Sequence, residues 1–491
     1  MDAPREAGAE TGSGLRQLAG LVGGPLLAVA LLVAGTPEGL SDAGWRTLAV
    51  GLLMATWWIT EAVPIPATAL LPVVLFPLLG VLSVRETTAP YANPLIYLFL
   101  GGFMIATGME RWGLHRRIAL AVVAAVGARP RRLILGFMVA AAGLSLWISN
   151  TATALMMMPI ALSVVHLARE TVEPRDATRF GAALMLAVAY ACSIGGIGTL
   201  IGTPTNALLA AFVLEEYGRT IGFVEWMRLG LPIAVLGIPI VHLVLTRLVF
   251  PVRFRELPGG RELIARERAQ LGPWKRGERA VAFVFLCVAA LWIARPALAA
   301  LVPGLSDTGI AVAGALVLFA WPVDARRLEF ALDWGSARRL PWGVLILFGG
   351  GLCLATATRT TGLADWLGAS MAGLAGIPTP LLVLVVVAAT ILLTELTSNT
   401  ATAAAFLPVL ASMAHGLGVE PLVLLVPAAI AASCAFMLPV ATPPNAIVFG
   451  TGEVTIPQMV RAGVLLGVIF SLLVTAVAFL LVPVTLGPAA G

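Results

Sequence analysis

Long apolar segments alternate with short polar ones along nearly the whole chain. Most of the apolar segments approach or exceed the roughly 20 residues that an α-helix needs to cross the hydrocarbon core of a bilayer. Eleven of them lie at 20–36, 46–62, 66–83, 95–110, 181–213, 229–250, 281–301, 308–322, 341–357, 421–449 and 460–484. The pattern predicts an all-α polytopic membrane protein with about eleven transmembrane helices.

Composition narrows the class further. Of the 491 residues, 59% are hydrophobic and 12% are charged, whereas a soluble domain carries roughly 25% charged residues. Too few polar groups are present to cover a surface in water, which excludes soluble, secreted and disordered classes. The four cysteines show no metal-ligand spacing and no disulfide pattern. The net charge of +5 resides in short loops, so we expect no nucleic-acid partner.

Basic residues indicate the orientation of the chain, because Lys and Arg accumulate in short cytoplasmic loops. With the N-terminus inside, 25 of the 31 basic residues fall on the cytoplasmic side. The six assigned to the outside are Arg46, Arg85, Arg219, Arg228, Arg295 and Arg359. We expect a cytoplasmic tail (1–19), a first half (20–250), a cytoplasmic connector (251–280) and a second half (281–491).

The apolar pair at 133–168 differs from the spanning segments. Basic residues flank it on both sides, at 129–132 and at 169–179, so both of its ends belong on the cytoplasmic side. Its middle holds the polar triplet 149–151, Ser-Asn-Thr. A chain that enters and leaves on one side, with polar residues at its deepest point, predicts a re-entrant hairpin that lines a cavity. Two plain spanning helices joined outside are the alternative.

Self-comparison reveals an internal repeat. The segment SNTATALMMMPI at 149–160 recurs as SNTATAAAFLPV at 398–409, with seven identities in twelve positions. Blocks on either side, 101–114 with 350–363 and 203–207 with 442–446, follow in the same order. The second hairpin, 380–414, has few flanking basic residues and is expected to start and end outside. The halves are then inverted, an arrangement typical of secondary transporters with a binding site near the membrane midplane.

The two polar triplets suggest what such a site binds. Their hydroxyl and amide groups supply donors for an anion and oxygen acceptors for a hard cation, and helix ends at a hairpin tip add free N–H groups. Neither tip carries Lys or Arg, so an anion brought to the midplane needs bound cations to offset its charge. For the nearby acidic residues Glu61, Glu110 and Glu395 we expect helix-end or interhelical hydrogen bonding, with a proton or cation relay as the alternative.

Prolines mark a break in two of the long apolar segments. Thr203-Pro204 lies within 181–213, and Thr442-Pro443-Pro444 lies within 421–449. Proline removes a backbone donor and pushes the preceding residue out of the helical region. We expect both helices to be broken there, which frees carbonyl groups such as those of Gly202 and Ala441 to face an ion; a simple kink is the alternative.

These motifs resemble those of the divalent anion/sodium symporter family, whose members carry di- and tricarboxylates or sulfate. The segment 432–448 resembles the family's signature, Trp58 through Pro64 resembles its early Trp…Thr-Glu-Ala-x-Pro segment, and the paired triplets resemble its substrate motifs. The resemblance covers about 20 to 485. It implies a homodimer whose protomers have eleven spanning helices and two hairpins. It also implies an elevator mechanism, in which a transport domain slides against a dimerising scaffold domain.

The resemblance also implies which residues bind substrate and sodium. The implied substrate contacts are Ser149, Asn150, Thr151, Thr203, Pro204, Ser398, Asn399, Thr400, Thr442 and Pro443. The first sodium site would comprise Ser145, Ser149, Asn150 and Gly202. The second would comprise Thr394, Thr397, Asn399 and Ala441. Thr205, where the second half has Pro444, departs from the symmetry of the two halves.

Taken together, these features predict a sodium-coupled symporter that imports C4-dicarboxylates such as succinate, malate and fumarate. The Arg-for-Lys bias, 30 to 1, points to a GC-rich genome and a bacterial inner membrane. Alternatives are a dicarboxylate exchanger that is not driven by sodium, and a sulfate or citrate symporter of the same family. An intramembrane hydrolase would need a base beside Ser149 or Ser398, and neither tip offers a His or Asp. We therefore expect that the protein is not an enzyme. A passive channel is also disfavoured, because duplicated closed hairpins suit a transporter with alternating access better than an open pore.

Overall fold

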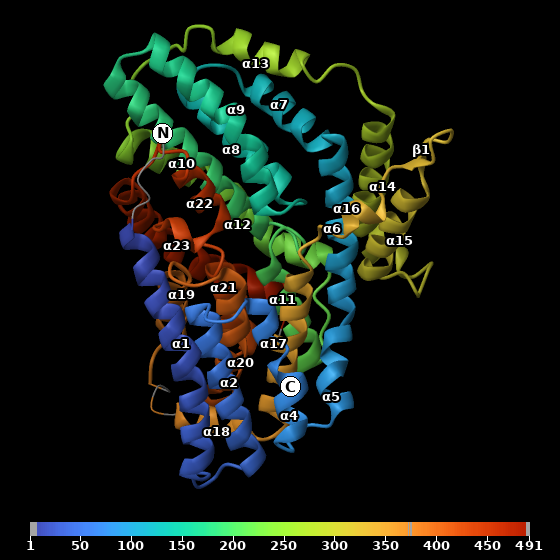
Figure 1. Ribbon diagram of the computed structural model, residues 1–491, viewed down its shortest axis with the longest axis vertical. Coiled ribbons are helices and arrows are strands. Elements are labelled where there is room, and N and C mark those ends of the chain that lie inside the picture. The colour runs from blue at the N-terminus through green and yellow to red at the C-terminus, as the bar shows by residue number, and fades with distance from the viewer. Residues whose placement is uncertain (1–6, 372, 374–375, 488–491) are drawn as a thin grey trace.

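The computed structural model describes residues 7–371, 373 and 376–487, and this part of the chain is almost entirely helical (Figure 1). Nine of its helices are long and apolar enough to cross a membrane. Shorter apolar helical segments accompany them at Ile65–Leu78, which is divided between two helices, and at Asp307–Ala320, Thr379–Thr394 and Pro421–Ala431. A single short hairpin, β1 (Pro322–Asp324) with β2 (Glu329–Phe330), is the only sheet in the described residues. The predicted all-α membrane architecture is confirmed.

The first half and the connector contain fifteen helical elements. In chain order they are α1 (Ala7–Ala34), α2 (Asp42–Thr60), α3 (Ile65–Thr68), α4 (Leu71–Leu78), α5 (Val84–Thr88), η1 (Ala89–Ala92), α6 (Pro94–Trp112), α7 (Leu114–Val126), α8 (Pro130–Ser145), α9 (Asn150–Thr171), α10 (Pro174–Ile197), α11 (Pro204–Tyr217), α12 (Phe223–Leu243), the π-helical turn η2 (Val244–Val249) and α13 (Gly260–Ala269).

The second half follows a similar order. Its helices are α14 (Arg276–Leu298), α15 (Asp307–Ala320), α16 (Trp334–Ala337), α17 (Trp342–Thr360), α18 (Leu363–Ser370), α19 (Thr379–Thr394), α20 (Asn399–Leu417), α21 (Pro421–Ala431), the short turn η4 (Pro439–Ala441), α22 (Pro443–Phe449) and α23 (Ile456–Thr485). Both predicted hairpins are present, as α8 with α9 and as α19 with α20. Both long apolar segments are broken as expected, between α10 and α11 and between α21 and α22.

The repeat is visible in the geometry of the helix ends. Gly113 (φ 75°) ends α6 and Gly362 (φ 76°) follows α17, both in the left-handed conformation that glycine adopts without strain. In both halves a short helix then follows, α7 or α18. The first hairpin lies in the upper half of Figure 1 and the second lies lower, as expected for two halves of opposite orientation (Figure 1).

The helix α7 lies within 111–132, a segment that the basic-residue count places on the cytoplasmic side and that is not among the predicted helices. Its basic side chains bind the connector and the helix that follows it: Arg116 pairs with Glu267 at 3.0 Å and Arg117 pairs with Glu278 at 3.0 Å. A basic amphipathic helix and a basic loop have similar composition, which is why the charge count alone missed this helix.

The apolar segment at 66–83 also differs from its prediction as one spanning helix. It forms two short helices, α3 and α4, because prolines interrupt it. Pro64 precedes α3, Pro66 lies inside it, Pro72 begins the first turn of α4 and Pro77 lies near its end.

The centre of the molecule is α10, whose most apolar 18-residue window is entirely buried. It packs against both arms of the first hairpin, against α12 and against α22. By contrast, only 17% of the corresponding window of α1 and 22% of that of α14 are buried. The broken helices therefore meet at the core, whereas α1 and α14 carry the apolar outer surface that a membrane protein presents to lipid.

Candidate substrate and cation site

The two hairpin tips and the two helix breaks meet at one cavity of about 800 Å³. Ten of its lining residues are the predicted substrate contacts, namely Ser149, Asn150, Thr151, Thr203, Pro204, Ser398, Asn399, Thr400, Thr442 and Pro443. Segments about 250 residues apart in the sequence thus form one polar surface, as the repeat predicts.

Local sequence explains why the tips point into this cavity. Ser149 precedes α9, and its hydroxyl accepts the N–H of Ala152 at 3.2 Å, which caps the helix. Asn150 and Asn399 are the first residues of α9 and α20. The N-terminal ends of two helices, with their partial positive charge, therefore face the cavity. This geometry suits an anion.

A first cluster of oxygen atoms lies at the tip of the first hairpin, where α8 ends and α9 begins. The Ser145 hydroxyl donates to Oδ1 of Asn150. A Cβ added to Gly202 would lie 2.5 Å from the carbonyl oxygen of Gly196 and 2.9 Å from that of Ser145. A Cβ added to Gly196 would lie 2.6 Å from Oδ1 of Asn150 and 3.1 Å from the Gly202 carbonyl oxygen. Ser145, Asn150 and Gly202 of the predicted first sodium site are thus brought together, and Gly196 joins them, while the hydroxyl of the fourth, Ser149, caps α9.

The second hairpin holds a matching cluster. The Thr394 hydroxyl lies 2.7 Å from Oδ1 of Asn399 and 2.9 Å from the carbonyl oxygen of Ala432. This repeats the pairing of Ser145 with Asn150, with the same spacing of five residues. Ala441 lines the cavity beside Asn399. The Thr397 hydroxyl instead contacts that of Thr402 at 2.6 Å, so Thr397 is the one predicted ligand of this site whose hydroxyl is engaged outside the cluster.

Two buried asparagines organise the helix breaks. Nδ2 of Asn206 donates to the carbonyl oxygens of Gly196 and Thr199, at 3.0 and 2.7 Å. In the other half, Nδ2 of Asn445 donates to the carbonyl oxygens of Ala435 and Leu438, at 3.3 and 3.1 Å. Each amide thus binds carbonyl groups seven and ten residues before it, which fixes the unwound backbone beside each oxygen cluster. The spacing of these asparagines after a proline was the sequence signal for this role.

Thr205 lies at the position where the two halves differ, because the second half has Pro444 there. Its hydroxyl lies 2.9 Å from that of Ser433, on the other half. The departure therefore adds a direct hydrogen bond between the two breaks and leaves the first oxygen cluster intact.

Glu395 is buried at the end of α19, beside the tip of the second hairpin, where its carboxylate binds the unwound backbone before α22. Its Oε1 accepts the N–H of Phe436 at 2.6 Å and that of Met437 at 2.9 Å, and its Oε2 accepts the N–H of Leu438 at 3.0 Å. The expected hydrogen-bonding role of Glu395 is confirmed. Glu61 and Glu110, the other two acidic candidates, line the cavity.

Replacing Glu395 by Ala is expected to lower the thermal stability of the purified protein by several degrees. Three N–H groups, that of buried Phe436 and those of partly buried Met437 and Leu438, would lose their acceptor, at a cost of up to roughly 1–3 kcal/mol for the buried one and less for the others. Glu395→Gln, which keeps one acceptor oxygen, should fall between this variant and the parent. The check is a melting curve in detergent, with Glu262→Ala, an exposed carboxylate on α13, as the control. Equal melting temperatures for Glu395→Ala and the parent would contradict this role.

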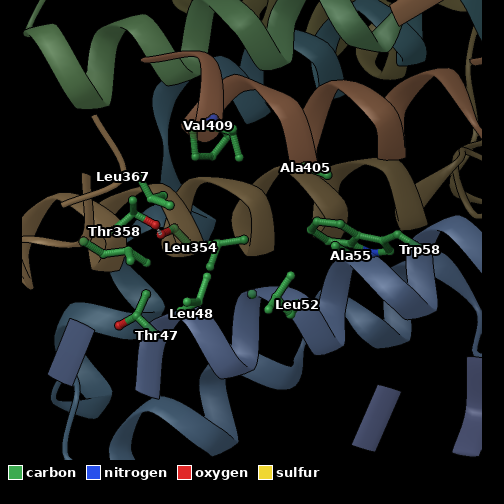
Figure 2. Close-up of a pocket in the computed structure, with 13 residues that line it drawn as sticks. Thr47, Leu48, Leu52, Ala55, Trp58, Leu354, Thr358, Leu367, Ala405 and Val409 are labelled. Atoms are coloured by element: carbon green, nitrogen blue, oxygen red, sulfur yellow. Dashed lines mark hydrogen bonds between the residues drawn. The ribbon is translucent and has the colours of Figure 1, made fainter. Parts of the chain in front are cut away.

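A second cavity, between α2 and the helices α17, α18 and α20, is almost entirely apolar (Figure 2). The hydroxyls of Thr47 and Thr358 line it, but each donates to a carbonyl of its own helix, at 2.8 Å in both cases. This cavity offers no comparable polar surface to an anion, and none of the predicted site residues lines it.

A helical membrane protein built from two related halves, whose broken helices and hairpin tips meet at one polar cavity, has the architecture of a secondary transporter. Comparison with known proteins identifies the family. The family model described as "Sodium:sulfate symporter transmembrane region" matches residues 19–484. The chain belongs to this sodium:sulfate symporter family, in agreement with the resemblance of its motifs to the divalent anion/sodium symporters.

Named relatives match over almost their whole length. The sodium-dependent dicarboxylate transporter SdcS of Staphylococcus saprophyticus is 43% identical over 479 residues, which cover 96% of this chain and 92% of that protein. The protein of the same name from Staphylococcus aureus is 42% identical over the same shares of the two chains.

Two solved structures share the fold. The YdaH transporter of Alcanivorax borkumensis has a TM-score of 0.55 and 17% identity, with 80% of this chain and 88% of that chain covered. MtrF of Neisseria gonorrhoeae has a TM-score of 0.57 and 14% identity, with 93% and 96% covered.

Proposed function

We propose that this protein is a sodium-coupled secondary active transporter that imports C4-dicarboxylates such as succinate, malate and fumarate. The observation that carries the proposal is the shared cavity, which both Ser-Asn-Thr tips line, with an uncharged oxygen cluster at each tip. The names of the 42–43% identical relatives, sodium-dependent dicarboxylate transporters, support the choice of substrate and coupling ion.

The chemistry of the cavity explains why sodium and the anion would bind together. The ten polar and proline residues at the tips and breaks would contact the dicarboxylate through hydroxyls, amides and helix N-termini. These groups are uncharged, so a dianion there lacks a fixed counter-ion. Sodium ions held by the two oxygen clusters would supply that charge, which couples the two binding events.

The first sodium would be held by Ser145, Ser149, Asn150 and Gly202, and the second by Thr394, Thr397, Asn399 and Ala441. Hydroxyl, amide and backbone carbonyl oxygens are suitable ligands for a hard monovalent cation. The pairing of Thr397 with Thr402 means that this residue would have to rotate, or contribute through its backbone, to reach the second ion.

Transport would proceed by an elevator mechanism in a homodimer of the bacterial inner membrane. In the orientation indicated by the basic loops, the cavity walls at Glu61, Glu110 and Arg339 lie at helix ends on the cytoplasmic side. At the opposite end, Glu216 pairs with Arg359 at 3.4 Å, which joins α11 to α17. This arrangement supports assignment of the structure to an inward-open state.

We further propose that the protein is not an enzyme. Ser149, the residue best placed to act as a nucleophile, has its hydroxyl engaged as the cap of α9. A serine nucleophile requires a base that accepts its proton, whereas the hydrogen bond of this hydroxyl is to a backbone N–H.

The test is uptake of labelled succinate into proteoliposomes, with and without an inward sodium gradient, and with or without succinate inside. Uptake into empty vesicles that requires the sodium gradient is the expected result. Uptake that requires internal succinate and ignores sodium would instead establish an exchanger. If succinate does not move in either arm, inhibition and uptake assays with citrate and sulfate identify the substrate class and overturn the dicarboxylate assignment.

A further inference from the structure

Three charged residues, Glu61, Glu110 and Arg339, line the cavity that holds the hairpin tips. Arg339 is the one basic side chain among its described lining residues. All three belong to helix ends or to the loop before α17, away from the Ser-Asn-Thr tips in the sequence. The cavity that holds the uncharged tips is therefore also lined by two carboxyl groups and one guanidinium.

The backbone near Arg339 is held firmly. Oδ1 of Asp333 accepts the N–H of Ser336 at 2.7 Å, and the Asp333 carboxylate also pairs with Arg111. These two partners, the Ser336 N–H first and the Arg111 guanidinium second, hold the pKa of Asp333 below its ordinary value. The Asp333 anchor is therefore charged at neutral pH. The N–H of Arg339 in turn donates to the Ser336 carbonyl at 3.1 Å.

The guanidinium of Arg339 is left available by this arrangement. Its side chain is exposed and forms no hydrogen bond or ion pair with the described residues. Glu110, at the end of α6, is near enough to interact with it electrostatically. The neighbouring Arg338 is also exposed but does not line the cavity. Two adjacent arginines thus differ in whether they face the route to the site.

We propose that Arg339 is a second, transient contact for the dicarboxylate on the cytoplasmic side of the cavity, which the anion meets as it leaves or enters the tip site. An arginine presents a planar fork of donors that matches a carboxylate. Its positive charge also attracts a dianion in a cavity whose other titratable lining groups, Glu61 and Glu110, are carboxyl groups. This inference rests on the proposed dicarboxylate transport.

The proposed contact is made only from the cytoplasmic side of the membrane. A comparison of transport from the two sides therefore tests it. Labelled succinate transport is measured in right-side-out and in everted membrane vesicles, with the sodium gradient directed inward in each. In everted vesicles, where the cytoplasmic face meets the added succinate, Arg339→Gln is expected to raise the KM roughly five- to tenfold, more at low ionic strength. In right-side-out vesicles its KM should stay within about twofold of the parent.

Two further variants separate charge from structure. Arg339→Lys keeps the charge but not the fork and should recover most of the affinity, whereas Arg338→Gln should match the parent in both preparations. An unchanged KM for Arg339→Gln in everted vesicles, or an equal change with Arg338→Gln, overturns the inference. Parent vesicles without succinate transport would instead refute the proposed function. If Arg339→Gln does not reach the membrane, the lysine variant carries the test, with a rise of about two- to threefold expected in everted vesicles only.

Discussion

Replacing Asn150 or Asn399 by Ala is expected to reduce sodium-dependent succinate uptake to the level of liposomes that contain no protein. Each asparagine has two functions in the geometry of the cavity. Its Oδ1 accepts the hydroxyl five residues earlier, from Ser145 or from Thr394, and the residue also lines the anion cavity. Truncation removes an oxygen from the cation cluster and a polar group from the anion site together. Loss of one hydrogen bond to a charged group alone corresponds to roughly 10- to 100-fold in affinity.

A binding measurement shows whether the ion site itself is lost. A ligand that binds only the folded state stabilises it by RT ln(1 + [L]/Kd) and so raises the melting temperature as its concentration exceeds Kd. Sodium chloride should therefore stabilise the parent more than choline chloride does. Each alanine variant should show a smaller sodium effect. Gln270→Ala, which truncates an exposed amide in the connector, should behave like the parent. Normal uptake in both Asn variants would refute the site assignment.

Much of the fold was predictable because its signals are local. A polar triplet inside an apolar segment disfavours an uninterrupted spanning helix, so the hairpin predicted at 133–168 is found as α8 and α9, within three residues of those limits. Proline after threonine breaks a helix by its own geometry, and both predicted breaks are present. The internal repeat supports each of these predictions a second time, because a pattern that occurs twice at a fixed offset rarely arises by chance.

Other features depend on contacts that no local pattern encodes. Gly196 joins the first oxygen cluster because α10 passes close to the end of α8, and glycine pairs are common in membrane helices for many reasons. The three backbone partners of Glu395 lie more than 40 residues downstream. The short helices α7 and α18 each follow a left-handed glycine, Gly113 or Gly362, and both are too short to be recognised in the sequence pattern as spanning segments.

The helix breaks show how the two kinds of information combine. The sequence predicts that the carbonyls of Gly202 and Ala441 are freed, but freed backbone at this depth needs partners. In the structure these partners are Asn206 and Asn445. The side-chain amide of each donates to the carbonyl groups seven and ten residues before it. A rigid unwound segment holds its remaining oxygens at a fixed spacing, which a selective cation site requires.

Alanine at Gly202 is therefore expected to abolish sodium coupling through the first cluster while leaving most of the fold in place. The added Cβ would lie 2.5 Å from the Gly196 carbonyl oxygen and 2.9 Å from that of Ser145, both backbone atoms that a side-chain rotation does not relieve. The two segments must move apart, and the oxygens that would bind the ion move with them. Overpacking of this kind costs roughly 1–3 kcal/mol, so we expect a modest fall in melting temperature in sodium-free buffer.

Gly143→Ala provides the matched control, because a Cβ at Gly143, on the same hairpin, meets no atom within 4 Å. The distinguishing measurement is the dependence of uptake on sodium concentration, together with the sodium-induced rise in melting temperature. Gly143→Ala should reproduce the parent in both. Gly202→Ala should lose the sodium-induced stabilisation that belongs to the first cluster, and its uptake should no longer respond to sodium in the range that saturates the parent. A parental sodium response in Gly202→Ala would mean that the ion binds elsewhere, since the oxygens of Ser145, Gly196 and Gly202 could not keep their present positions around the added methyl group.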